Sequence, residues 1–389
     1  MELRNAVKNS KAFMTLLDVY EHRDEYLKEL KAQNKKLIGV VGDEAPDELL
    51  VAAGYVPVKV CGKIGASTKH ASENLENSVF TDLEFATMYD RLLDGTYKEM
   101  LERVIISHPM PWNYRLFLSI REYKRQFPDA PAPEIYFLDF EGKTSLIDQE
   151  RNIMVYKNLK TAVESWTGKE ITDEEIIKAV EICNDERDAI AAFDDLRKAV
   201  PSKVTGTEAL VVIGAALFME KETYTKLVRE LVSDAQNWPE IDLPRVYFSG
   251  SDQHTADLYE RIEGGGVNVV GEDHNWGTRF YYGNVVLDKD LIGSLVNRYM
   301  FKMPGAKATV AERVAALSKA VKETSAQGVF FYYTRTDGYA CWEYPSKRDM
   351  LNDAGVSHVI LSRQSVPEKY PEKVDEAVAE LKTKMNGGE

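Results

Sequence analysis

The densest group of chemically capable residues in the sequence is the segment 271–281, Gly-Glu-Asp-His-Asn-Trp-Gly-Thr-Arg-Phe-Tyr. Two carboxylates, an imidazole and a guanidinium lie there within eight residues, at Glu272, Asp273, His274 and Arg279. These residue types suit a metal ion, but their spacing matches no defined metal motif. Two interpretations stay open, in which these side chains either face a substrate or form an arginine–carboxylate network that fixes a domain interface.

A second candidate is the segment 107–113, Ser-His-Pro-Met-Pro-Trp-Asn, which follows an apolar run directly. It presents the imidazole of His108 and the indole of Trp112 on a backbone that two prolines stiffen. In a functional interpretation, His108 is a site residue and Trp112 is a lid or a stacking platform. In a structural interpretation, His108 is a surface residue whose hydrogen-bonding groups have partners, and Trp112 is a core residue that caps the sheet.

The three cysteines, Cys61, Cys183 and Cys341, are widely spaced and odd in number, which excludes a disulfide framework and a CxxC-type zinc module. Cys183 shares a helix face with apolar residues and is predicted to be a small buried hydrophobe. Cys61 ends a predicted strand, where burial and a thiol in a loop are similarly compatible with the sequence. Cys341 follows one predicted strand and precedes a helix, which is where a thiolate ligand or a nucleophile would stand.

Signatures of several common chemistries are missing from the sequence. It contains no P-loop, no HExxH motif, no Ser-His-Asp signature and no NAD or PLP signature. The segment 249–255 could receive an anion at a helix start, but it lacks the GxGxxG spacing. We therefore expect Ser251 or Asp252 to cap the helix that follows.

The elements that must position these residues are short apolar runs that alternate with helical patterns, as in β-α-β units of a parallel sheet. The predicted strands are 37–41, 56–61, 104–107, 134–139, 245–249, 267–270, 328–333 and 356–361. The first four and the last four follow one plan. The predicted fold is therefore α/β, with two open parallel-sheet domains of the Rossmann or flavodoxin type, related by internal duplication and joined by a helical segment.

The predicted boundaries are an N-terminal α/β domain at 1–147, a helical segment at 148–237 and a C-terminal α/β domain at 238–389. Ligands of open parallel sheets bind beyond the carboxyl ends of the strands. The loops of interest are therefore 42–46, 107–113, 139–144, 249–255, 271–281 and 333–345.

Charge and hydropathy exclude some classes of partner. The 389-residue chain carries a formal net charge of −14 and has no Lys/Arg run, which argues against nucleic-acid binding. No apolar run approaches the roughly 20 residues that span a bilayer. The N-terminus shows no signal-peptide pattern, so a cytoplasmic protein with no membrane partner is expected.

Three stretches of the sequence resemble one enzyme family. They are the segment 38–58, which contains Pro-Asp-Glu-Leu-Leu-Val-Ala-Ala-Gly-Tyr-Val-Pro, the segment 133–139, and the segments 327–331 and 341–345 taken together. In content and order they resemble subunits of 2-hydroxyacyl-CoA dehydratases and benzoyl-CoA reductases, and the likeness covers most of the chain. The Ala-Ala-Gly-x-x-Pro block is the most specific part.

The resemblance implies a subunit that acts on CoA thioesters by ketyl-radical dehydration or by reduction. It also implies a [4Fe-4S] cluster between two α/β domains, a heterodimer with a related subunit, and an ATP-dependent activator. Family subunits usually supply three cysteine ligands, and Cys341 matches the third. The first position, near 77–80, has no cysteine here, and His108-Pro109-Met110 stands at the second. His108 could replace one ligand, as histidine does in some clusters.

On this resemblance the interdomain cleft would be lined by residues from both halves. Glu44 and His108 are the candidate acid–base residues, Cys341 is the candidate iron ligand, and the expected substrate contacts are Asp43, Trp112, Asp273, His274 and Arg279. Two alternatives remain. The chain is a cluster-free partner or scaffold subunit that binds acyl-CoA or completes a partner's site, or it is an unrelated two-domain small-molecule binding protein.

Overall fold

The computed structural model of the protein describes residues 3–75, 83–108, 111–142, 144–305, 307–335, 337, 340–365 and 371–387. Its first sheet contains four parallel strands in the order β2-β1-β3-β4. The strands are β1 (Lys36–Val41), β2 (Tyr55–Lys59), β3 (Arg103–Ser107) and β4 (Glu134–Leu138).

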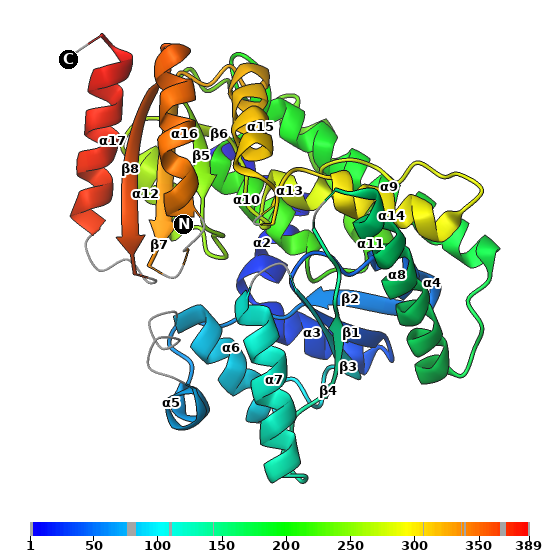
Figure 1. The fold of residues 1–389 in the computed structure, drawn as a ribbon. Coiled ribbons are helices and arrows are strands. Elements are labelled where there is room, and N and C mark those ends of the chain that lie inside the picture. The colour runs from blue at the N-terminus through cyan, green and yellow to red at the C-terminus, as the bar shows by residue number, and fades with distance from the viewer. Residues whose placement is uncertain are drawn as a thin grey trace.

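The second sheet repeats this arrangement. Its four parallel strands are ordered β6-β5-β7-β8, which is the same order once the numbers are shifted by four. The strands are β5 (Arg245–Gly250), β6 (Asn268–Glu272), β7 (Gly328–Thr334) and β8 (Ser357–Gln364). The prediction of two parallel-sheet α/β units with one plan is therefore confirmed, and the two sheets form separate lobes (Figure 1).

Helices surround and connect the sheets. The N-terminal half has α1 (Asn5–Lys8), α2 (Lys11–Glu21), α3 (Arg23–Ala32), α4 (Asp47–Ala52), α5 (Lys69–Asn74), α6 (Leu83–Leu93) and α7 (Pro111–Gln126). The connecting helices are α8 (Leu146–Thr167), α9 (Asp173–Lys198), α10 (Gly206–Ala216) and α11 (Lys221–Ala235). The C-terminal half has α12 (Asp257–Gly264), α13 (Thr278–Tyr281), α14 (Leu291–Phe301), α15 (Val310–Glu323), α16 (Ala340–Asp353) and α17 (Pro371–Met385).

Local sequence signals set the ends of several helices. Thr172, Thr205 and Thr309 each accept a hydrogen bond from the backbone of a glutamate three residues later, whose side chain bonds back to the threonine N–H. These capping boxes satisfy amide groups that would otherwise lack partners at the first turn. At the other end of α8, Gly168 adopts a left-handed conformation with φ of 68°, which stops the helix.

The prediction that Ser251 or Asp252 caps the helix that follows, α12, is wrong. The N-cap of α12 is Ala256, with no side-chain hydrogen bond. Ser251 instead accepts a hydrogen bond from the Thr334 N–H, and Asp252 accepts one from the Asn275 N–H. These two side chains do not cap the helix because they form hydrogen bonds with residues at the ends of neighbouring strands.

The two lobes share parts of one hydrophobic core. One buried cluster combines Ile38 of β1 and Leu138 of β4 with Tyr156 of α8 and Leu295 of α14. A helix that follows the second lobe's β6 thus packs against the first lobe's sheet. The division of the chain at residues 147 and 237 stays a prediction.

The longest helix, α9, ties both lobes together through buried ion pairs. Arg187 pairs with Glu48 at the start of α4, next to the first sheet. Arg197 pairs with Glu272 at the end of β6 in the second sheet. All four side chains are at least 94% buried, so removing one partner would leave an uncompensated charge in the core. Among the described helices, none combines the length and the apolar sequence needed to cross a membrane.

Candidate functional site

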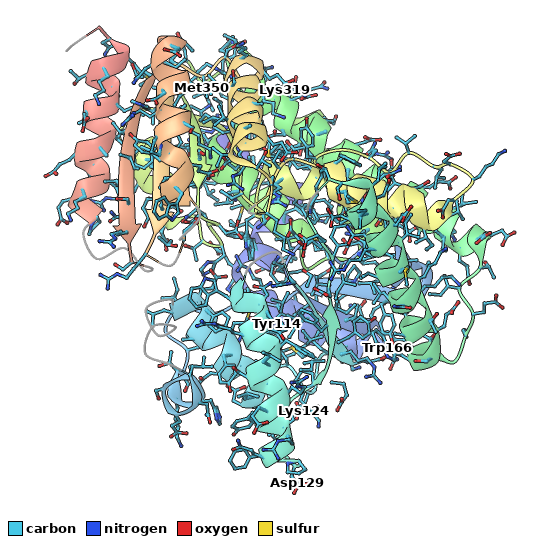
Figure 2. The ribbon with its side chains drawn as sticks, viewed as in Figure 1. Tyr114, Lys124, Asp129, Trp166, Lys319 and Met350 are labelled. Carbon is cyan, nitrogen blue, oxygen red and sulfur yellow. The ribbon has the colours of Figure 1, made fainter. Side chains whose placement is uncertain are left out.

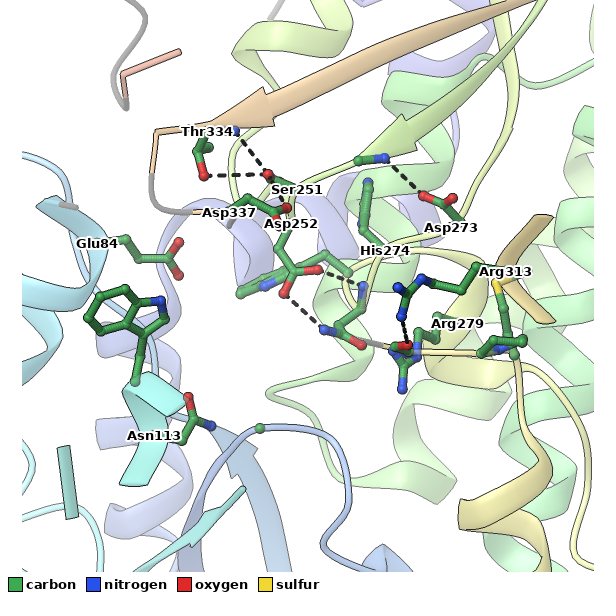
Figure 3. A pocket seen from close by; sticks show the side chains of 18 of the residues that line it. Glu84, Asn113, Ser251, Asp252, Asp273, His274, Arg279, Arg313, Thr334 and Asp337 are labelled. Atoms are coloured by element: carbon green, nitrogen blue, oxygen red, sulfur yellow. Dashed lines mark hydrogen bonds between the residues drawn. The ribbon is translucent and has the colours of Figure 1, made fainter. Parts of the chain in front are cut away.

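A cavity of about 300 Å³ lies between the lobes, at the carboxyl ends of strands from both sheets. Its wall includes Gly42 after β1, Lys59 at the end of β2, Ser251 after β5 and Thr334 at the end of β7. Helices α6 and α7 complete it on the first lobe, and α15 and α16 on the second (Figure 3). We call it the interlobe cavity.

Asp273 forms one fixed acidic corner of this cavity. Its carboxylate accepts hydrogen bonds from Ser249 Oγ at 2.6 Å and from the Gly250 N–H at 2.9 Å. Gly250 has φ of 152°, and a side chain there would meet the Tyr332 carbonyl oxygen at 2.0 Å. Only glycine allows strand β5 to turn this close to β7 and to present its N–H to Asp273.

A lysine from α16 connects this corner to a second acidic group. Lys347 is 3% exposed and donates to Ser249 Oγ at 3.1 Å and to Glu343 Oε1 at 3.4 Å. Arg313 of α15 pairs with the same Glu343 and donates to the Gly305 carbonyl oxygen at 2.9 Å. The positive and negative groups in this wall therefore hold one another in place.

His274 is a buried imidazole in the cavity wall. Its Nε2 lies 2.9 Å from Tyr259 Oη, and its ring makes a T-shaped contact with Phe248. Burial lowers the pKa of His274 below its ordinary value, against the opposing effect of Glu272. The ring is thus neutral at physiological pH, with one nitrogen engaged by the tyrosine.

Three buried polar atoms in the segment after β6 have no hydrogen-bond partner in the described part of the protein. They are His274 Nδ1, Asn275 Oδ1 and Arg279 Nε. All three residues line the interlobe cavity. Buried polar groups are nearly always paired, so three unpaired atoms in six residues distinguish this segment among those that line the cavity.

The first lobe contributes a more apolar wall, which includes Trp112. Its Glu84 and Asn113 face the polar residues of the second lobe (Figure 3). Glu84 of α6 crosses to the second lobe, where its Oε2 lies 3.2 Å from His254 Nδ1. Burial opposes ionisation of Glu84, but His254 nevertheless holds its pKa below the ordinary value. This ion pair joins the lobes beside the cavity.

Asp43 stands behind the cavity wall and supports it. Its Oδ2 lies 2.9 Å from both Arg279 Nη2 and Lys302 Nζ. Burial would raise the pKa of Asp43, but the two cations lower it well below the ordinary range. Burial in turn lowers the pKa of Lys302 to about 8. Asp43 therefore positions the Arg279 guanidinium.

Glu44 faces a different, adjoining cavity of about 210 Å³, which we call the side cavity. Burial and the neighbouring Asp43 carboxylate raise the pKa of Glu44 to about 8. The Glu44 carboxyl is therefore mostly protonated at neutral pH. The interlobe and side cavities share Arg279 and the chain segment 303–305.

His108 is not among the described residues that line these two cavities. Its Nδ1 is 3.5 Å from Asp139 Oδ1, and its ring packs against Tyr114 and Phe137. Burial and Lys307 lower the pKa of His108. The site thus brings together Trp112, Asp273, His274 and Arg279, with Asp43 and Glu44 adjoining, whereas His108 is turned toward Asp139.

The described residues do not fit an iron–sulfur cluster. They contain no group of three or more His, Cys, Asp or Glu side chains placed to hold a metal ion. Cys61 and Cys183 are free and buried, and burial raises the pKa of both thiols, which disfavours the thiolate that iron requires. The side chain of Cys341 and the segment 77–80 lie outside the described residues.

The two duplicated sheets, with a polar cavity at their carboxyl edges, define a two-lobed α/β protein. Residues 44–386 match the family described as 2-hydroxyglutaryl-CoA dehydratase, D-component, and the chain belongs to this family. The resemblance noted in the sequence is thereby confirmed.

Curated relatives cover nearly the whole chain. It is 25% identical over 376 residues to the (R)-phenyllactyl-CoA dehydratase beta subunit of Clostridium sporogenes, which covers 93% of this chain and 96% of that protein. It is 24% identical over 350 residues to (R)-2-hydroxyglutaryl-CoA dehydratase subunit beta of Acidaminococcus fermentans, with 86% and 88% covered. It is 22% identical over 341 residues to one subunit of the benzoyl-CoA reductase of Thauera aromatica, with 84% and 85% covered.

Sequence reasoning missed the cations that organise the site, namely Lys302, Arg313 and Lys347. Each lies on or beside a helix far along the chain from the carboxylate it pairs with, except for the Lys347–Glu343 pair. That pair has i,i+4 spacing on α16, which is a detectable signal for neighbouring side chains on one helix face.

Proposed function

We propose that this chain is a CoA-thioester-binding subunit of a 2-hydroxyacyl-CoA dehydratase-like enzyme, and that the interlobe cavity receives the thioester. Family membership supports the substrate class, since the curated relatives are subunits of enzymes named for CoA thioesters. The observation that carries the location is the set of three unpaired polar atoms on His274, Asn275 and Arg279.

The proposed roles follow from the chemistry of each side chain. Arg279 is held by Asp43 and binds an anionic or carbonyl oxygen of the substrate. His274 uses its unpaired Nδ1 for a second hydrogen bond. Asp273 contacts the polar part of the substrate, and Trp112 provides a flat apolar surface.

We assign the acid–base role to Glu44 in preference to His108. A general acid works best when its pKa lies near the working pH, and the pKa of Glu44 is raised to about 8. His108 is held beside Asp139 and is not among the described residues that line either cavity.

The ketyl-radical reaction that the resemblance implies needs an electron from an iron–sulfur cluster. Because the described residues do not fit such a cluster, we propose that the related partner subunit of a heterodimer carries it and receives the electron from the ATP-dependent activator. The chain then binds the acyl-CoA or completes the partner's site in the cytoplasm. Cys341 as an iron ligand is the competing proposal.

Anaerobic purification tests these two proposals against each other. After reconstitution with iron and sulfide, we expect the isolated chain to hold no stoichiometric iron, and Cys341→Ser to leave the iron content unchanged. Cys183→Ser is the matched control, because Cys183 is fully buried in α9. A brown protein that loses its iron with Cys341→Ser and keeps it with Cys183→Ser would contradict the cluster-free proposal.

Calorimetric titration with 3-phenylpropionyl-CoA tests the binding site itself. Arg279→Met should weaken binding by about tenfold or more, since a hydrogen bond to a charged group contributes roughly 1.5–3 kcal/mol. The matched control is Arg229→Met, because Arg229 forms an exposed pair with Asp185 on α9 and α11. Equal affinities for the wild type and Arg279→Met would place the thioester elsewhere.

A further inference from the structure

The side cavity differs from the interlobe cavity in the character of its walls. Its wall includes charged side chains, among them Glu44, Lys307 and Lys319, the last of which lies on α15 (Figure 2). Most of the remaining wall is aromatic or aliphatic. These wall residues are Phe140, Met300, Phe301, Met303, Ala308 and Ala320.

Two described residues of this wall, Glu44 and Arg279, each have a buried polar atom without a hydrogen-bond partner. Glu44 is 5% exposed, and its Oε2 has no hydrogen-bond partner among the described residues. The nearby cations are engaged elsewhere. Lys302 Nζ donates to the Asp43 carbonyl oxygen at 2.6 Å, and Lys307 Nζ donates to the Phe140 carbonyl oxygen at 3.0 Å.

A cavity of this kind suits an apolar group that carries one hydrogen-bond acceptor. Cavities of about 150 Å³ with apolar walls bind benzene, so a volume of about 210 Å³ has room for a phenyl ring or a branched short chain. The protonated form of Glu44, which predominates at neutral pH, would donate to a carbonyl or hydroxyl oxygen.

The side cavity also lies within reach of the proposed thioester site. Both cavities are lined by Arg279 and by the segment 303–305, so the two cavities adjoin at these residues. Gly305 allows the close approach, because a side chain there would meet the Arg279 guanidinium at 2.1 Å.

We propose that the side cavity is the acyl subsite, which binds the apolar acyl or aryl part of the thioester while Glu44 donates a hydrogen bond to its oxygen. This assignment rests on the proposed function for the CoA portion of the ligand. It makes the side cavity the determinant of acyl selectivity, separate from the groups in the interlobe cavity that hold the rest of the thioester.

Filling the side cavity tests this assignment. Ala308 lines the side cavity but not the interlobe cavity, so Ala308→Phe should obstruct only the proposed acyl subsite. Ala311→Phe, at an exposed position of the same helix region, is the matched control. Circular dichroism and thermal unfolding of both variants establish that they fold.

Calorimetric titrations compare CoA, 3-phenylpropionyl-CoA and the N-acetylcysteamine thioester of 3-phenylpropionate. We expect the wild type and Ala311→Phe to prefer phenylpropionyl-CoA over CoA by about tenfold or more, as burial of a phenyl group predicts. Ala308→Phe should abolish this preference and the binding of the N-acetylcysteamine thioester, with the affinity for CoA unchanged.

Two variants of Glu44 test the hydrogen bond. Glu44→Gln keeps a donor and should retain the acyl preference, whereas Glu44→Leu removes the donor and should reduce it several-fold. An acyl preference that survives Ala308→Phe, or that is absent from the wild type, would overturn the acyl subsite.

The same titrations distinguish a failure of the proposed function from a failure of the acyl-subsite proposal. If CoA adds no affinity beyond that of the N-acetylcysteamine thioester, the CoA-binding proposal is wrong. The response of the small thioester to Ala308→Phe still decides whether the side cavity binds acyl groups.

Discussion

The two lobes have the same strand order but carry different residues at the carboxyl ends of their strands. In the first lobe, β1 leads to Asp43, which points its carboxylate at cations behind the cavity wall. In the second lobe, β5 and β6 lead to Ser251 and Asp273, whose side chains bond across to neighbouring strand ends and line the interlobe cavity. The first lobe thus supplies support and an apolar wall, and the second supplies most of the polar wall.

The two lobes therefore agree in their buried strands and differ in the loops that follow them. The buried strands define both sheets, and apolar side chains cover both faces of each sheet, as expected for parallel strands. The loops at the carboxyl edges are free to diverge, because they do not determine strand pairing. The polar groups of the interlobe cavity therefore come mostly from the second lobe, while the first lobe contributes an apolar wall and, in the side cavity, Glu44.

The largest expected effect distinguishes the two arginines of α9, Arg187 and Arg197, whose buried ion pairs connect this helix to the two lobes. Arg197→Met should destabilise the protein by about 3–5 kcal/mol, because Arg197 pairs with two buried carboxylates. Its loss leaves Glu272 buried without a cation, whereas Asp194 keeps its pair with Lys198. Arg187→Met should cost less, since Tyr299 still donates to Glu48 at 3.1 Å. Urea denaturation measures the free energy of unfolding of both variants. A larger loss of stability in Arg187→Met than in Arg197→Met would contradict this prediction.

The next effect concerns Gly305 and Arg279, which line both cavities. Gly305→Ala should displace the Arg279 guanidinium, because the new Cβ would lie 2.1 Å from it. We expect phenylpropionyl-CoA to bind about tenfold more weakly, with a small change in stability. Gly264→Ala is the control, since nothing lies within 4 Å of its added Cβ. Unchanged affinity in Gly305→Ala would argue against a binding role for Arg279.

The pH dependence of stability tests the raised pKa of Glu44 in the first lobe. The pKa of Glu44 rises from 4.5 to about 8 on folding, so the folded state retains a proton that the unfolded chain releases. This contribution is fully present below pH 4.5 and is lost as the pH rises to about 8. Glu44→Gln does not titrate, so its stability should fall less than that of the wild type across this window. Parallel stability curves for the two proteins, measured by urea denaturation at each pH, would contradict the raised pKa.

The smallest expected effect lies at the contact between lobes. Glu84→Gln removes the ion pair with His254 but keeps a side chain of similar size. Because the Glu84 side chain is 29% exposed, we expect a loss of about 1 kcal/mol or less. Urea denaturation measures this loss, and a loss as large as that of Arg197→Met would show that this contact stabilises the protein as much as the Arg197 ion pairs of α9 do.

The sequence allowed the sheets and part of the site to be predicted. Alternating apolar runs indicated all eight strands, and the rule that ligands bind at carboxyl ends selected the segment that contains His274 and Arg279. These features depend on local patterns or on general topology, so one sequence suffices to find them.

Other parts depend on contacts between distant segments and were not predictable. The helices α14 and α15 were missed, although α14 packs against α8 across the lobes. The raised pKa of Glu44 arises from burial by remote elements, and Ser251 exchanges its expected capping role for contacts with Thr334 and Asp337. Such pairings are set by tertiary packing and have no signal in local spacing.

The most direct test of the account is a structure of the chain bound to 3-phenylpropionyl-CoA. The account predicts the thioester in the interlobe cavity, with polar contacts to Arg279 and His274 Nδ1, and the phenyl ring in the side cavity against Phe140. A ligand bound away from the segment 274–279, with those polar atoms still unpaired, would contradict it.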